Sequence, residues 1–185
     1  PGFFAILLAQ EGYQVTAIDC TEEMLAEAQR NAGALADRIR WIQMDAQQLD
    51  FSDQSFDLVV SRNLTWVLEE PEEAYREWYR VLKSGGMMLN FDANWYRYLY
   101  DEEMRKGYEA DRAATAAEQV RDEYVNTDIE AMEEIARNVP LSRELRPQWD
   151  EQILQQTGFG TIDIDTDIWQ KLWTEDEKIN YAPTP

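Results

Sequence analysis

The sequence predicts an α/β fold with a doubly wound, mostly parallel sheet and a helical insertion. Three observations lead to this expectation. Strand-like runs alternate with predicted helices of about 10–15 residues through residue 91. A long helical stretch with charged faces then interrupts the alternation, and a further helix and strand-like run follow it. The length of 185 residues corresponds to about one domain with one sizeable core.

The first predicted elements are two helices on either side of a short strand. Residues 3–9 are apolar and predict a buried helix that ends near Gly12. Residues 13–18 contain several β-branched side chains and predict a strand that ends at Asp19. Thr21 is then expected to cap a helix whose acidic first turn suits the helix dipole.

Three more strands continue the pattern. Residues 39–44 predict a strand that ends at Asp45, and residues 56–60 predict the next one. A helix is expected over residues 72–82, and the glycines after it lead into a strand at residues 87–91. This order of strands and helices predicts βαβ units and therefore a parallel sheet.

The last part of the chain contains the insertion and the return to the core. A helix at residues 149–156 leads into an expected strand at residues 161–168, where Asp and Ile alternate. That alternation favours a strand with one solvent-facing side over a calcium loop, which needs a glycine and a glutamate at fixed positions. We expect a core made of residues 1–95 and 147–185, incomplete at both ends, and a helical insertion or lid at residues 96–146.

Composition excludes several classes of function. Asp and Glu number 37 against 17 for Lys and Arg, and the net charge of −20 argues against nucleic acid or an anionic membrane as a partner. The chain has no histidine, which excludes a Ser-His-Asp triad and a two-histidine zinc site, and we expect no metal. A single cysteine and the lack of an apolar run of about 20 residues lead to the expectation of a cytoplasmic protein.

A glycine and an acidic residue form half of a nucleotide-binding pattern. Gly2 precedes the first helix, and Asp19 ends the following strand. In open α/β sheets, a glycine at this place lets a ligand approach the backbone, and the acid accepts hydrogen bonds from ribose hydroxyls. By itself the pattern fits a nicotinamide-dependent dehydrogenase equally well, or a simple glycine turn and strand end.

Three further motifs make the pattern specific. They are the Asp45-Ala46 pair, the FDLVVS strand at residues 56–61, and the RVLKSGG run at residues 80–86. In this order and spacing, the motifs resemble class I S-adenosylmethionine-dependent methyltransferases of the small-molecule, methyltransferase type 11-like kind. The resemblance covers most of residues 1–95. It implies a Rossmann-like fold, S-adenosyl-L-methionine as the cofactor, and in-line transfer of a methyl group to a small-molecule acceptor.

The resemblance also implies roles for individual residues. Asp19 would hold the ribose diol, Asp45 would accept from the adenine amine beside the Ala46 backbone, and Met24 would pack on the adenine. The alternatives are that Asp45 only caps a turn and that Met24 belongs to the helix core. The cofactor-binding residues predicted in this way are Gly2, Asp19, Cys20, Met24, Asp45, Ala46, Ser61 and Asn63.

The acceptor is expected where strand ends meet the insertion, in a region rich in aromatic residues. Aromatic faces bind flat or cationic groups and exclude water from a sulfonium, although they also commonly pack against a neighbouring helix. Arg146 can meet an anionic acceptor or pair with surface carboxylates. The sequence does not identify a catalytic base, and Asp, Glu, Tyr or water remains available if the acceptor must lose a proton. The expected acceptor residues are Trp66, Asn94, Trp95, Tyr96 and Arg146.

The sequence departs from the family at both ends. It opens after the family's first strand and most of its glycine loop, so the sheet as given would lack its middle strand. We expect a longer protein or a second chain, such as the other copy in a homodimer, to supply that strand. Two rival functions remain open, a nicotinamide-dependent oxidoreductase and a non-catalytic binding module with a Rossmann-like fold.

Overall fold

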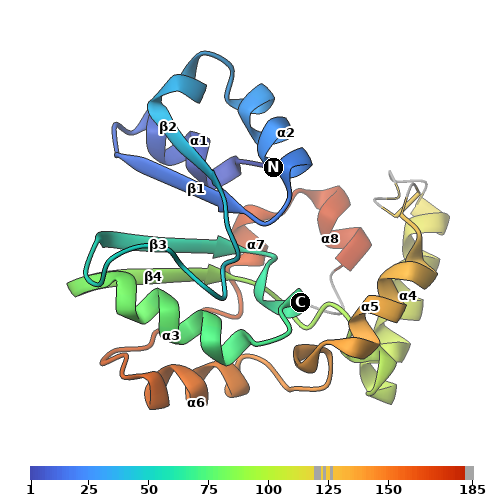
Figure 1. The fold of residues 1–185 in the computed structure, drawn as a ribbon. Coiled ribbons are helices and arrows are strands. Elements are labelled where there is room, and N and C mark those ends of the chain that lie inside the picture. Colours follow the sequence, from blue (N-terminus) through green and yellow to red (C-terminus); the bar gives the residue numbers. More distant parts are fainter. Residues whose placement is uncertain (119–121, 123, 126, 182–185) are drawn as a thin grey trace. The chain divides into compact units, whose positions relative to one another are not determined.

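The computed structural model describes residues 1–118, 122, 124–125 and 127–181 (Figure 1). The chain divides into two compact units, which are described separately. Unit 1 comprises Pro1–Val60 and Glu72–Leu89, and unit 2 comprises Ser61–Pro71 and Asn90–Pro185. The sequence assigned residues 147–185 to the core, whereas this division groups that segment with the helices of unit 2. Within the described ranges, no helix is both long and apolar enough to cross a membrane.

The strands of unit 1 form two pairs. β1 (Val15–Asp19) pairs in parallel with β2 (Ile39–Gln43), with Val15 opposite Ile39 and Asp19 opposite Gln43. β3 (Phe56–Arg62) neighbours β4 (Leu82–Phe91), and the two arrows point the same way in Figure 1. These four strands and their α/β order confirm the predicted fold class. Among the described residues no ladder joins the two pairs, although the sequence predicts a single sheet.

Two helices and a 3-10 turn accompany β1 and β2. α2 (Glu22–Ala32) buries Leu25, Ala28 and Ala32, a spacing of three to four residues that places them on one helix face. Ala32 then joins Ile39 and Ala9 in the core of this region. η1 (Gly33–Arg38) connects α2 to β2.

α1 (Phe3–Gln10) is less buried than its apolar sequence predicts. Only Ala9 of this helix is buried, while Phe3 is 58% and Leu7 is 41% exposed. The helix packs through a narrow face that includes Ala5, Ile6 and Ala9. The prediction of a helix is therefore confirmed, and the prediction that this helix is buried is wrong for the described chain.

α3 (Pro71–Val81) anchors the segment that follows β2. Arg80, in the last turn of the helix, donates to the carbonyl oxygens of Leu49 and Phe51 at 2.9 and 2.7 Å. Trp78 Nε1 donates to the carbonyl oxygen of Ala46 at 2.9 Å. The helix ends one residue earlier than predicted, and β4 begins at once with Leu82. The RVLKSGG run thus contains Arg80, which holds the segment after β2, and the first residues of β4.

Unit 2 is mainly helical. The sequence predicts one long helical stretch in the insertion. The structure has two separate helices there, α4 (Glu102–Glu118) and α5 (Ile129–Asn138). Asp128 caps α5 by accepting from Ala131 N at 3.0 Å. The remaining elements are η2 (Thr65–Val67), η3 (Arg97–Leu99), η4 (Pro140–Ser142), α6 (Gln148–Thr157), α7 (Trp169–Leu172) and α8 (Glu175–Tyr181).

The predicted strand at residues 161–168 is wrong. Residues 161–165 have no regular structure, and Ile164 is exposed. A strand needs a neighbour that satisfies its backbone donors and acceptors, and no described strand pairs with this segment. The predicted helix before it is confirmed as α6, which ends at Gly158 with a φ of 115°.

Replacing Gly2 by Ala tests the close contact between α1 and α2. Gly2 has a φ of 81°, and a Cβ there would lie 3.1 Å from Ala28 Cβ. We expect Gly2→Ala to lower the free energy of unfolding by about 2–4 kcal/mol, since it combines left-handed strain with crowding. Urea denaturation measures the loss. Gly12→Ala is the matched control, because its φ is 89° and a Cβ there would meet nothing within 4 Å. Equal losses in the two variants would contradict the role of crowding.

The hydrogen bonds of Glu77 make the stability of unit 1 depend on pH. Its carboxylate accepts from Leu49 N at 2.9 Å and from Arg80 Nε at 2.7 Å, and the hydrogen bond from Arg80 lowers the pKa of Glu77 below 4.5. A lowered pKa stabilises the fold above the unfolded value, and this contribution is lost as pH falls through the folded value.

We expect Glu77→Gln to cost about 1–3 kcal/mol at neutral pH, and the difference from wild type to shrink below the ordinary glutamate pKa. Urea unfolding of both proteins at several pH values measures this. Glu73→Gln on the exposed face of α3 serves as the control, because its ion pair with Arg76 is half-exposed. A gap between Glu77→Gln and wild type that widens in acid would contradict the account.

Candidate functional site

The ends of β1 and β2 bring two acidic residues to the same edge of the sheet. Asp19 is the last residue of β1 and lies opposite Gln43, the last residue of β2. Beyond the ladder, Met44 N donates to the carbonyl oxygen of Asp19 at 3.0 Å, and Gln43 Nε2 donates to that of Cys20 at 3.0 Å. Asp45 follows directly. Parallel pairing therefore places both predicted acidic residues at the carboxyl ends of neighbouring strands.

The two carboxylates have local partners and remain accessible. Asp19 Oδ1 accepts from the backbone and the hydroxyl of Thr21, both at 2.9 Å, and no described residue is bonded to its Oδ2. Thr21 is the N-cap residue of α2, as predicted, but its hydroxyl donates to Asp19 and does not cap the helix. Asp45 is exposed, and its Oδ1 accepts from Gln47 N at 2.8 Å. Asp45 thus shapes the turn, and its role as a ligand stays a prediction.

The other residues predicted for the cofactor have varied surroundings. Met24 is 45% exposed, so it does not belong to the helix core. Cys20 is an exposed free thiol. Ser61 is buried, and no partner for its hydroxyl is found within the described ranges. Asn63 follows β3 with a φ of 51°, and its backbone N–H donates to Phe91 at 2.8 Å.

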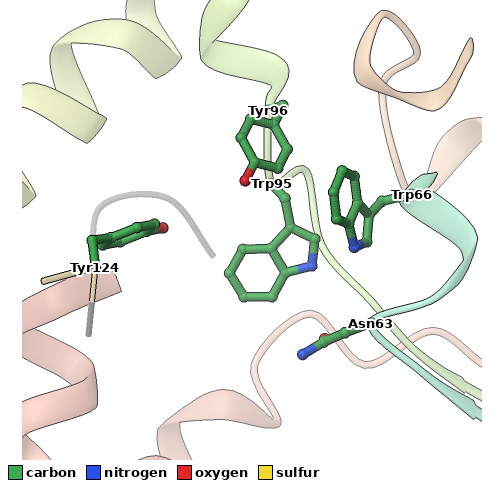
Figure 2. A pocket seen from close by; sticks show the side chains of 5 residues that line it. All are labelled: Asn63, Trp66, Trp95, Tyr96 and Tyr124. Carbon is green, nitrogen blue, oxygen red and sulfur yellow. The ribbon is translucent and has the colours of Figure 1, made fainter. Parts of the chain in front are cut away.

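Unit 2 contains a pocket with aromatic walls. Figure 2 shows its lining, and its volume is about 190 Å³. The rings of Trp66 and Tyr96 lie 4.9 Å apart with an angle of 36° between their planes. The structure therefore brings together four residues predicted for the site and adds one from the insertion. The lining residues are Asn63, Trp66, Trp95, Tyr96 and Tyr124.

Sequence reasoning missed Tyr124 because no motif surrounds it and it lies far from Trp95 along the chain. The guanidinium of Arg112 lies 4.6 Å from the centre of the Tyr124 ring, and Arg112 pairs with Asp122 at 2.9 Å. The only signal available from sequence was the expectation that the insertion forms a lid. Tyr124 lies within residues 96–146, and the role of that segment as a lid stays a prediction.

Asp92 connects the two tryptophans of the pocket. Its Oδ2 accepts from Trp66 N at 3.0 Å and also from the Thr65 hydroxyl. Its Oδ1 accepts from Trp95 Nε1 at 2.9 Å and from Ala93 N at 2.9 Å. One carboxylate therefore fixes the backbone beside one tryptophan and the indole ring of the other. No motif in the sequence singles out this residue.

Arg146 balances the charge of Asp92. The side chains of Arg146 and Asp92 are 5% and 1% exposed, and Arg146 Nη1 lies 3.1 Å from Asp92 Oδ2. Arg146 Nε and Nη2 donate to the carboxylate of Asp150 at 2.7 and 2.8 Å, an arrangement with two parallel hydrogen bonds. Arg146 therefore pairs with carboxylates, as one interpretation of the sequence had it, but in the interior of unit 2 and not at the surface.

Asn94 is hydrogen-bonded to the backbone of Arg146 next to the pocket. Its side-chain nitrogen donates to the carbonyl oxygen of Arg146 at 3.0 Å, and its side-chain oxygen accepts from Arg146 N at 3.1 Å. Neither Asn94 nor Arg146 is among the lining residues. Their hydrogen bonds with each other place both residues within the wall of the pocket.

Tyr96 in the pocket wall and its neighbour Tyr98 do not supply a base at neutral pH. Burial raises the pKa of Tyr96, and the nearby Tyr108 and Glu133 add to this effect. The same causes raise the pKa of Tyr98, whose hydroxyl donates to Glu133 Oε1 at 3.1 Å. Both phenols therefore stay protonated. In the part of the chain that the structure describes, no group of three or more His, Cys, Asp or Glu residues could hold a metal ion.

Parallel strands with flanking helices and acidic strand ends define a Rossmann-like α/β protein, and comparisons show which family its first half resembles. Residues 1–90 match the family model described as "Methyltransferase domain". The chain is 35% identical over 109 residues to the ubiquinone/menaquinone biosynthesis C-methyltransferase of Roseobacter denitrificans, covering 55% of this chain and 41% of that protein. It is 42% identical over 77 residues to a phosphatidylethanolamine N-methyltransferase of Cereibacter sphaeroides, covering 40% and 38%.

Solved structures agree with this fold. A putative methyltransferase from Bacillus halodurans is 28% identical with a TM-score of 0.50, covering 58% of this chain and 49% of that one. Phosphoethanolamine N-methyltransferase 2 of Haemonchus contortus, in complex with S-adenosyl-L-methionine, is 21% identical with a TM-score of 0.62, covering 94% and 35%. Residues 1–90 are thus similar to the methyltransferase domain family, and the resemblance to class I enzymes is confirmed. The chain spans less than half the length of these two curated relatives.

Removing the charge of Asp92 tests the support behind the pocket. We expect Asp92→Asn to lower the free energy of unfolding by about 3 kcal/mol or more, because it breaks a buried ion pair. Urea unfolding followed by tryptophan fluorescence measures the loss. Asp101→Asn is the control, since Asp101 is more exposed and lies 3.8 Å from Arg97. A loss no larger than that of the control would show that Asp92 is not essential to this region.

Proposed function

We propose that this protein transfers a methyl group from S-adenosyl-L-methionine to a small-molecule acceptor. The observation that carries the proposal is the position of Asp19 and Asp45 at the ends of paired parallel strands. Two carboxylates at one sheet edge suit a nucleoside, because one can accept from ribose hydroxyls and the other from the amine of adenine. The methyltransferase relatives support the same conclusion.

The side chains at this edge fit the cofactor. Asp19 has an oxygen without a described partner, and Met24, in the first turn of α2 after Asp19, is 45% exposed. In unit 2, the buried hydroxyl of Ser61 also lacks a partner among the described residues, so a polar ligand group could satisfy it. We assign Asp19 to the ribose, Asp45 and the Ala46 backbone to the adenine edge, and Met24 to the adenine face. Gly2, Cys20, Ser61 and Asn63 complete the proposed cofactor site.

Bound S-adenosyl-L-methionine supplies an electrophilic methyl group on a sulfonium. The chain's residues then need to hold the acceptor in line with the C–S bond of the sulfonium and to keep water away. Alignment of this kind supplies most of the acceleration of a methyl transfer. The aromatic pocket is the proposed acceptor site, with Trp66, Trp95 and Tyr96 in contact with the acceptor. Asn94 and Arg146 serve it from within the wall, as positioning residues.

The relatives name two kinds of acceptor chemistry, carbon methylation in quinone biosynthesis and nitrogen methylation of a phospholipid amine. Either fits an aromatic site at the level of this proposal. A cytoplasmic location and a homodimer stay predictions from the sequence.

Binding of S-adenosylhomocysteine to Asp19 and Asp45 variants tests the proposal. We expect Asp19→Asn and Asp45→Asn each to weaken binding about 10-fold to 100-fold, the effect of losing a hydrogen bond to a charged group. Isothermal titration calorimetry measures the affinity. Asp37→Asn, an exposed residue of η1, is the matched control and should bind as wild type does.

Two results would overturn the proposal. One is a wild-type protein that binds neither S-adenosyl-L-methionine nor S-adenosylhomocysteine at millimolar concentration, which would favour a non-catalytic binding module. The other is tight binding of a nicotinamide cofactor to the same protein, which would favour an oxidoreductase.

A further inference from the structure

We propose that the aromatic pocket binds an amine acceptor whose methylated product carries a quaternary ammonium group. This inference rests on the proposed methyl transfer and names its acceptor class. Four aromatic side chains and one amide line the pocket, and none of the five carries a charge at neutral pH. Trp and Tyr faces attract cations through their ring quadrupoles, and Trp does so most strongly.

The shape of the pocket favours a compact, rounded group over a flat ring. A flat ring is best held between parallel faces, but the planes of Trp66 and Tyr96 differ by 36°. In Figure 2 Tyr124 lies on the side of the pocket opposite Trp66, so aromatic groups surround the space from several directions. The volume of about 190 Å³ is also below the roughly 300 Å³ that encloses a whole drug-sized ligand. The pocket therefore suits a head group.

The electrostatics around the pocket favour a positive ligand. Trp95 Nε1 donates to the Asp92 carboxylate at 2.9 Å, and such a bond polarises the indole and enriches its face in electron density. The positive charge of Arg146 is balanced by Asp92 and Asp150, and that of Arg112 by Asp122. Glu133, which accepts from Tyr98, is likewise paired, with Arg137 at 2.7 Å. An anionic ligand would find no unbalanced cation among these groups.

A tertiary amine also suits a site to which no base is assigned. In solution its ammonium form first loses a proton to water, and the uncharged nitrogen then uses its lone pair to form the new N–C bond while the C–S bond breaks, and the electrons of that bond stay on sulfur as a thioether. No proton has to leave during the transfer step itself, which agrees with a chain that lacks histidine and keeps Tyr96 protonated. The positive charge begins on sulfur and ends on nitrogen. Aromatic faces around the nitrogen stabilise that charge as it develops.

Choline and its neutral carbon isostere, dimethylbutanol, separate a cation site from a merely apolar one. Both probes are titrated into the wild-type protein saturated with S-adenosylhomocysteine, and binding is followed by calorimetry and tryptophan fluorescence. We expect choline to bind at least about fivefold more tightly than the isostere. The preference should be lost in Trp66→Leu and reduced in Trp95→Phe, which keeps an aromatic ring. Trp169→Leu, a change outside the lining, is the matched control.

The inference is overturned if the isostere binds as tightly as choline, if choline does not bind at millimolar concentration, or if Trp66→Leu keeps the full preference. Choline that binds the free protein but not the S-adenosylhomocysteine complex would also overturn it, because the pocket would then belong to the cofactor. If S-adenosylhomocysteine binds and choline does not, only this inference fails. If S-adenosylhomocysteine does not bind at all, the proposed function fails and this inference fails with it.

Discussion

The buried carboxylate of Asp92 is the constraint on which the pocket depends. A carboxylate whose side chain is 1% exposed is tolerated only when it is paired and hydrogen-bonded. Asp92 meets this requirement through its ion pair with Arg146 and through four hydrogen-bond donors from other groups. The donors include the backbone at Trp66 and the indole of Trp95. Satisfying one charge therefore fixes two walls of the pocket. Asp150 and Asn94 extend the same network to α6 and to the Arg146 backbone.

Unit 1 depends on an analogous constraint of backbone pairing. The parallel ladder sets where β1 and β2 end, and α3 then holds the segment after β2 through Trp78 and Arg80. A rigid scaffold thus positions short loops that carry the polar groups, which is the common arrangement of ligand sites. The chemistry expected here requires little more than alignment of two reactants. A site built from fixed backbone ends and packed rings suits that requirement.

The sequence predicted the elements that local signals define. The strands before Asp19 and Asp45 and the helix that begins after Thr21 follow from β-branched runs and turn residues. The strand at residues 161–168 could not be judged in this way, because strand formation depends on a partner elsewhere in the chain. Asp92, Tyr124 and the burial of Arg146 were missed for a related reason. Their roles come from contacts between residues far apart in sequence, which periodicity and motifs do not report.

The most direct test is a crystal structure of the protein with bound S-adenosylhomocysteine. The account predicts that the ribose hydroxyls lie within about 3 Å of the Asp19 carboxylate, with the adenine amine facing Asp45. Adenosine bound away from both carboxylates would contradict the assignment of this sheet edge as the cofactor site.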